Sequence, residues 1–145
     1  MVTKHTLDSL PCFALYSASK QLTGIYRSLL SRWDITYPQF LVLMALWEED
    51  KVSISELSER TTLGNSTLTP LIRLLEKKQL VKRRASETDE RQATISLTTR
   101  GKRLSHASER ITDDVLGKSG LTKRDARELI RICGKVRDGA ASSPL

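Results

Sequence analysis

The chain has 145 residues, of which 39% are hydrophobic and 5% aromatic, a length that predicts one domain or one domain with a helical extension. Its net charge of +7 and its pI near 9.7 favour a polyanionic partner. No apolar run approaches the ~20 residues that span a bilayer, and the N-terminus lacks the apolar core of a signal peptide. The two Cys and two His are too few for a disulfide scaffold or a clustered zinc site. We therefore expect a cytoplasmic protein with no membrane partner, no metal and no cofactor.

The first predicted helix runs from about Leu10 to about Trp33. Pro11 suits its first turn, where a missing N–H costs little. The apolar side recurs at helical spacing and consists of Leu15, Ala18, Leu22, Ile25, Tyr26 and Leu29. Cys12 then falls in the first turn, where unpaired N–H groups and the helix dipole favour a thiolate. The alternative is that Cys12 is a small hydrophobic residue buried among apolar neighbours.

A second helix is predicted to begin after Thr36, with Pro38 near its first position. This helix should lie central and buried because it is apolar almost all round, at Phe40, Leu41, Leu43, Met44 and Trp47. A polar turn follows at residues 48–51. Ser53 and Glu56 then form a predicted capping box that opens a third helix, which ends near Thr61.

The stretch from Gly64 to Leu97 predicts a fourth helix followed by a charged β-hairpin. The helix has one apolar face, spaced i, i+3, i+4 and i+7, made of Leu68, Leu71, Ile72 and Leu75. Asn65 or Ser66 can cap its N-terminus, and Pro70 is tolerable only near its start. The early outward face then carries Ser66, Thr67, Thr69 and Arg73.

The hairpin consists of two short predicted strands, Val81–Arg84 and Ala93–Leu97, joined by a polar link at residues 85–92. The segment from Arg73 to Arg84 holds six Lys or Arg and one acid, Glu76. A helix with small hydroxyls at its N-terminal end can enter a major groove, and a basic hairpin tip can reach a minor groove. The alternative is a solvated amphipathic helix with an ordinary hairpin. The order helix, short turn, helix, hairpin is that of a winged helix-turn-helix and favours DNA binding.

The C-terminal part predicts two more helices. The fifth opens at Leu97–Gly101 with an apolar stripe at Leu104, Ala107, Ile111 and Val115, and is broken by residues 117–120. The sixth is capped by Thr122 and Asp125 and has Ala126, Leu129, Ile130, Cys133 and Val136 on its apolar side. We predict a mainly α fold with a small β-hairpin wing: a winged helix-turn-helix at residues 34–98, dimerisation helices at 8–33 and 99–138, and a frayed tail at 139–145.

The chain resembles the MarR-type transcriptional regulators over nearly its whole length. The family's winged helix carries Asp-x-Arg and then a run ending in Leu-Thr, here Asp89–Arg91 through Thr98. Within the family it is similar to the organic hydroperoxide sensors, the OhrR branch. The resembling segments are the Cys-Phe-x-Leu-Tyr pattern at residues 12–16, Ile35–Gln39 at the start of the second helix, and the Thr-Leu-Thr-Pro sequence within residues 64–75.

The resemblance implies a peroxidatic role for Cys12, which an organic hydroperoxide oxidises to sulfenic acid. Tyr26 and Tyr37 correspond to the two tyrosines that donate hydrogen bonds to that sulfur. The alternative is that both tyrosines simply lie at the edge of an amphipathic core. Some members of the branch resolve the sulfenic acid with a second Cys of the partner subunit. Cys133 lies later in the chain than that residue and on an apolar face, so a small bacillithiol-like or cysteine-like thiol remains the alternative.

The predicted DNA contacts carry over residue by residue. Arg91, in the wing, would enter a narrow minor groove, while Asp89 would support the wing by pairing with a nearby Arg. Lys77 and Arg84, with Lys82 and Arg83, would contact phosphates or be simply solvated. The major-groove set is Ser66, Thr67, Thr69, Pro70 and Arg73.

The predicted function is therefore that of a homodimeric repressor, not an enzyme, that binds a pseudo-palindromic double-stranded DNA operator and releases it when an organic hydroperoxide oxidises Cys12. Two alternatives stay open. The first is a MarR-type repressor that responds to a reversibly bound phenolic or aromatic ligand, in which Cys12 is incidental. The remote second is a thiol peroxidase, for which the sequence offers no recycling motif.

Overall fold

The computed structural model describes residues 5–85, 89 and 92–144. It divides into two compact units. The winged unit comprises Tyr26–Ile111, and the helical unit comprises the residues up to Ile25 and those from Thr112 onward. Among the described residues, no helix is both long and apolar enough to cross a membrane.

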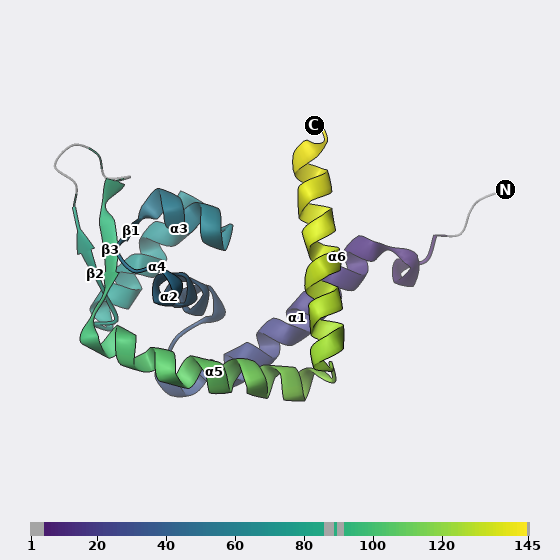
Figure 1. The fold of residues 1–145 in the computed structure, drawn as a ribbon, viewed down its shortest axis with the longest axis horizontal. Helices are drawn as coiled ribbons and strands as arrows, with labels where there is room; N and C mark the ends of the chain where they lie inside the picture. Colours follow the sequence, from purple (N-terminus) through teal and green to yellow (C-terminus); the bar gives the residue numbers. More distant parts are fainter. Residues whose placement is uncertain (1–4, 86–88, 90–91, 145) are drawn as a thin grey trace. The chain divides into compact units, whose positions relative to one another are not determined.

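The winged unit contains the predicted helix-turn-helix and wing (Figure 1). It begins with the last residues of α1 (Pro11–Leu30) and ends with the first half of α5 (Thr99–Ser119). Between them lie a short 3-10 helix (Ser31–Trp33), α2 (Tyr37–Glu48), β1 (Val52–Ser53), α3 (Ile54–Thr61), α4 (Asn65–Lys77), β2 (Val81–Arg84) and β3 (Thr94–Leu97). This order confirms the winged-helix prediction.

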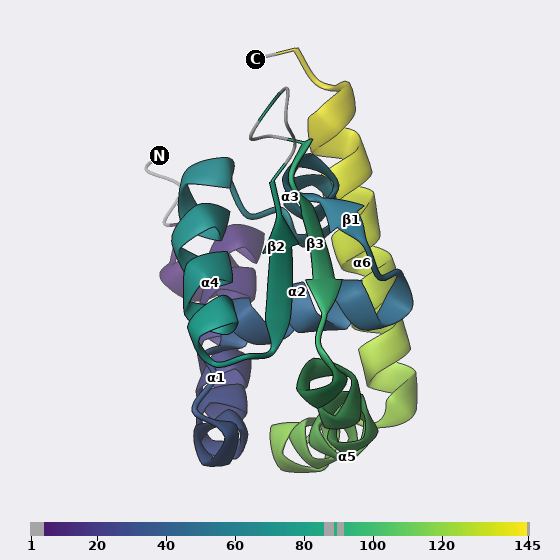
Figure 2. The ribbon, with the colours of Figure 1, turned by 90° about the vertical axis from the view of Figure 1, so that its left-hand side faces the viewer.

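The sheet is antiparallel with the order β1-β3-β2, so the central strand is β3 (Figure 2). The register places Val81 opposite Leu97 and Val52 opposite Ile95. Strand β2 has its predicted bounds, and β3 begins one residue later than predicted, at Thr94. Strand β1 was not predicted, because a two-residue strand shows no alternation of polar and apolar residues.

The core of the winged unit is built around α2, as its apolar sequence predicts. Leu43 and Val42 have no exposed side-chain surface, and Leu46 is 1% exposed. The buried residues that share this core come from α3, α4 and β3, and include Leu57, Leu68, Ile72, Leu75 and Ile95. Burying such a side chain contributes about 1.5–3 kcal/mol to the free energy of folding. This shared core therefore fixes α4 and the sheet against α2.

Local capping sets where several helices begin. Thr36 and Gln39 form a capping box at α2, in which the Thr36 backbone N–H donates to Gln39 Oε1 at 3.0 Å. The predicted box of Ser53 and Glu56 opens α3. The first helix is shorter than predicted, since α1 ends at Leu30 and a 3-10 turn takes the chain to Asp34, whose φ of 53° lies in the left-handed region.

Two predictions about α4 are wrong in detail. Neither Asn65 nor Ser66 caps it, because the helix already includes Asn65 and its N-cap is Gly64, which has no side chain. Pro70 lies inside the helix rather than in its first turn, so the carbonyl of Ser66 lacks its usual helical N–H donor. The N-terminal end of α4 therefore has backbone N–H groups that donate to no capping side chain, and a Ser66 carbonyl without its helical N–H donor.

The helical unit is made of the first part of α1, the second half of α5 and α6 (Lys123–Ser142), preceded by a short 3-10 helix at Leu7–Ser9. The predicted capping box of Thr122 and Asp125 opens α6. Helix α5 continues through Gly117 and stops before Gly120, whose φ of 76° explains why only the second glycine ends it. Helix α6 extends to Ser142, past residue 139 where a tail was predicted.

Replacing either of two glycines of α5 with alanine should change the stability of the fold, in opposite directions at the two positions. A Cβ at Gly101 would clash with the backbone oxygen of Leu80, whereas a Cβ at Gly117 would meet nothing within 4 Å. We expect Gly101→Ala to lower the free energy of unfolding by at least ~1–3 kcal/mol, and Gly117→Ala to raise it by about 0.5–1 kcal/mol. Thermal denaturation followed by circular dichroism measures both. Equal melting temperatures for the two variants would contradict the close approach of α5 to the turn before β2.

Candidate DNA-binding surface and sensor residues

Helix α4 presents two unlike faces. Its inner face is buried in the core, while Ser66, Thr67, Pro70, Arg73 and Lys77 are exposed. The side chain of Thr69 is half-buried, and its hydroxyl donates to the backbone oxygen of Asn65 at 3.0 Å. The structure thus brings all the predicted major-groove residues onto α4, with an exposed polar surface that a supported helix can offer to a ligand.

The basic residues between Arg73 and Arg84 separate into two groups. Lys78 pairs with Asp34, with Nζ 3.5 Å from Oδ2, and Arg83 is half-buried with its backbone N–H donating to Glu76 Oε1 at 3.2 Å. The exposed group is Arg73, Lys77, Lys82 and Arg84. These four cations are accessible to a polyanion and are carried by α4 and the neighbouring strand β2 (Figure 2).

The predicted wing tip is described only in part. Arg91 lies outside the described residues, and Asp89 is exposed. The minor-groove role of Arg91 and the supporting role of Asp89 stay predictions.

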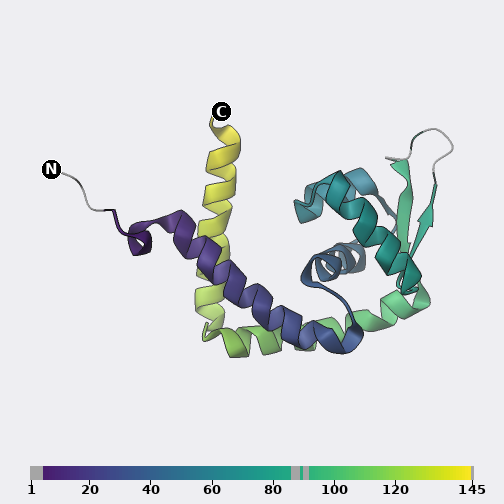
Figure 3. The same cartoon turned by 180° about the vertical axis from the view of Figure 1, so that it is seen from behind.

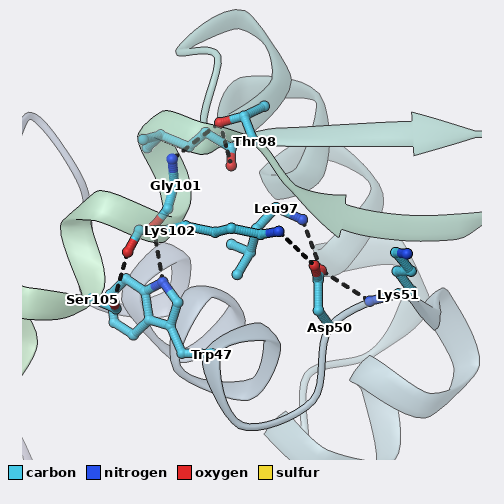
Figure 4. Close-up of polar contacts among 9 residues, drawn as sticks. Trp47, Asp50, Lys51, Leu97, Thr98, Gly101, Lys102 and Ser105 are labelled. Atoms are coloured by element: carbon cyan, nitrogen blue, oxygen red, sulfur yellow. Dashed lines mark hydrogen bonds and ion pairs between the residues drawn. The ribbon is translucent and has the colours of Figure 1, made fainter.

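The base of the wing joins the end of β3 to the first turn of α5 (Figure 4). We call this region, where Asp50, Leu97, Thr98 and Gly101 meet, the wing root. Asp50 Oδ1 accepts hydrogen bonds from the backbone N–H groups of Leu97 at 2.8 Å and Lys51 at 2.9 Å, and its Oδ2 lies 3.9 Å from Lys102 Nζ. The Thr98 hydroxyl accepts from the N–H of Gly101 at 3.0 Å. Asp50 thus connects the end of α2 to both β3 and α5.

Trp47 makes a second connection at the wing root. Its Nε1–H donates to the backbone oxygen of Gly101 at 2.9 Å, a bond between residues 54 positions apart in the sequence (Figure 4). The backbone of Gly101 also approaches Leu80 too closely for any larger residue. Helix α2, the turn before β2 and the first turn of α5 therefore meet at one backbone position.

The two predicted sensor tyrosines lie together in the winged unit. The rings of Tyr26 and Tyr37 are 4.8 Å apart and tilted by 44°. Burial raises the pKa of both phenols, and the charge that Tyr37 would carry raises the pKa of Tyr26 further. Both side chains therefore remain protonated at neutral pH and keep an O–H donor.

An aromatic row continues from this pair. The Tyr26 ring lies 5.4 Å from Phe40, and Phe40 lies 6.0 Å from Trp47 in an edge-on contact. The row comprises Tyr37, Tyr26, Phe40 and Trp47, and it ends at the hydrogen bond to Gly101. Sequence reasoning assigned Phe40 and Trp47 to the core and missed this row, because the contacts of Tyr26 on α1 with the rings of α2 leave no local pattern.

Both cysteines belong to the helical unit and are free thiols. Cys12 lies in the first turn of α1, as predicted, and is exposed rather than buried among apolar neighbours. Cys133 is half-buried on α6. Among the residues that the structure describes, no three His, Cys, Asp or Glu side chains are grouped to hold a metal ion.

Comparisons with known proteins agree with this architecture. The family model described as the transcriptional regulator SarA/Rot matches residues 24–108. The chain is 41% identical to the HTH-type transcriptional regulator TtmR of Methylorubrum extorquens over 92% of this chain and 69% of that protein. It is 37% identical to the organic hydroperoxide resistance transcriptional regulator of Bacillus subtilis over 85% of this chain and 84% of that protein.

The structural comparison gives the same result. AbfR of Staphylococcus epidermidis matches with a TM-score of 0.76 at 28% identity, covering 91% of each chain. The structure of reduced AbfR bound to DNA matches with a TM-score of 0.74 at 29% identity, over 90% of this chain and 89% of that one. A structure of disulfide-formed AbfR matches with a TM-score of 0.62 at 28% identity, over 90% and 86%. The chain is therefore a DNA-binding transcriptional regulator that belongs to the MarR/SarA family of winged-helix proteins.

Proposed function

We propose that this protein is a homodimeric repressor that releases its DNA operator when an organic hydroperoxide oxidises Cys12. The observation that carries the proposal is the exposed thiol of Cys12 in the first turn of α1. Two relatives support it: the B. subtilis regulator is named for organic hydroperoxide resistance, and AbfR has been solved both reduced on DNA and in a disulfide form. The resemblance at residues 12–16 supplies the assignment of the sensing role.

The exposed face of α4 is the proposed major-groove reader. An α-helix is about 10–12 Å across with its side chains, close to the ~12 Å width of the major groove. Arg73 would contact a base edge or phosphate, and Ser66, Thr67, Thr69 and Pro70 would line the groove. Lys77 and Arg84 would contact phosphates, and Arg91 would enter the minor groove with Asp89 supporting the wing.

A second copy of the chain is the proposed partner of the helical unit. This unit leaves large apolar side chains exposed, with Ile130 at 68%, Leu7 at 63%, Tyr16 at 62% and Val136 at 52%. Exposed apolar surface of this kind is stabilised by burial against a partner. A symmetric dimer would cover it and would present two copies of α4 to the two halves of a pseudo-palindromic site.

The proposed chemistry balances with the hydroperoxide as oxidant. The Cys12 thiolate attacks the distal peroxide oxygen, the O–O bond breaks, and an alcohol leaves after taking up a proton. The sulfur is oxidised to sulfenic acid while the peroxide is reduced. A second thiol then condenses with the sulfenic acid to give a disulfide and water. That thiol is either Cys133 of the partner subunit or a small cellular thiol.

The geometry of α1 bears on which chain supplies the tyrosines. Helix α1 runs from Pro11 to Leu30 and is seen from behind in Figure 3. Its sequence contains both Cys12 and Tyr26. The rise of about 1.5 Å per residue separates their backbones by about 21 Å, well beyond the reach of a thiol and a phenol. We therefore propose that Cys12 of one subunit accepts hydrogen bonds from Tyr26 and Tyr37 of the other, which makes the sensor a property of the dimer.

Mixed dimers test this arrangement. One chain carries Cys12→Ser and the other carries Tyr26→Phe with Tyr37→Phe, changes that keep the rings and remove the hydroxyls. If the site forms between subunits, the mixed dimer retains one complete site, and we expect it to release operator DNA on oxidation while each variant homodimer responds weakly or not at all. A mixed dimer that responds no better than the homodimers would contradict the proposed pairing.

A second candidate function is response to a reversibly bound small ligand. The winged unit has a hollow of about 290 Å³ lined by Arg32, Trp33, Asp34, Lys78, Leu80, Arg100 and Leu104. Its aromatic ring and its cations would suit an anionic aromatic ligand. An operator response to benzoate that survives Cys12→Ser and is lost on Arg100→Gln would support this candidate.

A further inference from the structure

We propose that Trp47 is a positioning residue that connects the tyrosine pair to the wing root, so that a change at the pair reaches the DNA-reading surface. This proposal rests on the sensing role proposed above. Trp47 belongs to the aromatic row and also bonds to α5, because its Nε1–H donates to the backbone oxygen of Gly101.

The first step of the argument is the continuity of the aromatic row. Neighbouring ring centroids lie 4.8, 5.4 and 6.0 Å apart from Tyr37 through Tyr26 and Phe40 to Trp47. These spacings fall within the range at which aromatic rings are in contact. Phe40 is 2% exposed, and because protein interiors are close-packed, a displaced neighbour is expected to press on its ring. A displaced Tyr26 ring therefore requires Phe40 and then Trp47 to repack.

The second step is the close packing and hydrogen bonding of the backbone at the wing root. The Gly101 backbone packs against the carbonyl of Leu80 so closely that a methyl group would not fit. The Thr98 N–H donates to that same Leu80 oxygen at 3.1 Å, and Asp50 accepts from the N–H of Leu97 at 2.8 Å. Because these bonds fix β3, the turn before β2 and α5 to one another, a shift of Trp47 at Gly101 moves them together.

The third step identifies what this movement changes. Strand β3 lies between β1 and β2, and α4 packs beside β2. The exposed cations Lys82 and Arg84 belong to β2. In the proposed mechanism, oxidation of Cys12 changes the sulfur group that accepts hydrogen bonds from the tyrosine hydroxyls, and this change would favour a different arrangement of the pair. Trp47 would then couple that rearrangement to the position of the wing.

Trp47→Phe tests the coupling because it keeps a six-membered ring beside Phe40 and removes the N–H donor together with the five-membered ring that carries it. Anisotropy with labelled operator DNA gives the ratio of oxidised to reduced Kd, and intact mass gives the extent of Cys12 oxidation by cumene hydroperoxide. We expect Trp47→Phe to oxidise like the wild type and to bind the operator within about threefold when reduced. Its oxidised-to-reduced Kd ratio should fall toward one, which is a loss of most of the ~10- to 100-fold change expected of the wild type and lies within the range of typical allosteric coupling.

Two further variants separate the possible results. Ser105→Ala is the matched control, since that hydroxyl bonds to the Lys102 oxygen inside α5 at 2.6 Å, and it should behave as wild type. Phe40→Leu interrupts the row at a second ring and should also lower the ratio. A wild-type ratio in both Trp47→Phe and Phe40→Leu overturns the proposal, as does a joint fall in melting temperature and reduced-state affinity with the ratio unchanged. An operator that wild-type protein keeps after full Cys12 oxidation contradicts the proposed function itself.

Discussion

Cys12→Ser is expected to bind its operator like the reduced wild type and to hold it when an organic hydroperoxide is added, while the wild type loses about 10- to 100-fold in affinity. Serine cannot form a sulfenic acid, and Cys12 is exposed in the structure, so the substitution should leave folding unchanged. Fluorescence anisotropy with DNA from the protein's own promoter region, at fixed salt and with increasing cumene hydroperoxide, measures both effects.

Cys133→Ser serves as the companion variant. If Cys133 resolves the sulfenic acid, this variant should fail to form an intersubunit disulfide on a non-reducing gel. If a small thiol resolves it, the variant should respond to peroxide like the wild type. Equal release by wild type and Cys12→Ser would show that Cys12 is not the switch, and the hollow lined by Trp33 and Arg100 would become the better place to look for an effector.

Arg73→Ala is expected to weaken operator binding by about 1–3 kcal/mol in each half-site, which is about 5- to 150-fold for a single contact. Arg73 is exposed on the outer face of α4, so its removal should cost little stability. Arg127→Ala on α6 is the matched control, because it removes the same charge from an exposed helical position outside the winged unit. Anisotropy titrations of both variants against operator and non-specific DNA, at several salt concentrations, distinguish a base contact from a phosphate contact.

A base contact by Arg73 would lower operator affinity and spare non-specific affinity, whereas a phosphate contact would lower both and reduce the salt slope by about one. Operator binding equal to that of Arg127→Ala would mean that Arg73 does not contact DNA, and the proposed docking of α4 would be wrong.

Much of the fold could be predicted because its signals are local. The apolar face that runs from Leu68 to Leu75 and the capping boxes at Ser53 and Thr122 act within a few residues, and the structure confirms them. Where a local signal was ambiguous, the prediction was less accurate. Gly117 and Gly120 look alike in sequence, but only Gly120 adopts the left-handed conformation that ends α5. The extension of α6 to Ser142 likewise had no sequence marker.

The candidate site was less predictable because its parts meet through tertiary contacts. The exposed face of α4 followed from periodicity, and the roles of Cys12, Tyr26 and Tyr37 came from a family resemblance. The contact between Trp47 and Gly101 and that between Asp50 and Leu97 join residues 54 and 47 positions apart. The sequence places Asp50 only in a polar turn, since a carboxylate in a turn carries no information about which distant N–H it will bind.

The most direct test follows Cys12 oxidation and operator occupancy in the same sample while organic hydroperoxide is added in small increments below one equivalent. Intact mass reports the oxidised fraction of Cys12, and anisotropy reports the bound fraction of DNA. The proposed mechanism predicts that DNA is released in step with the formation of oxidised Cys12 and is rebound after reduction by dithiothreitol. Complete oxidation of Cys12 with the operator still bound, or release before Cys12 is oxidised, would contradict it.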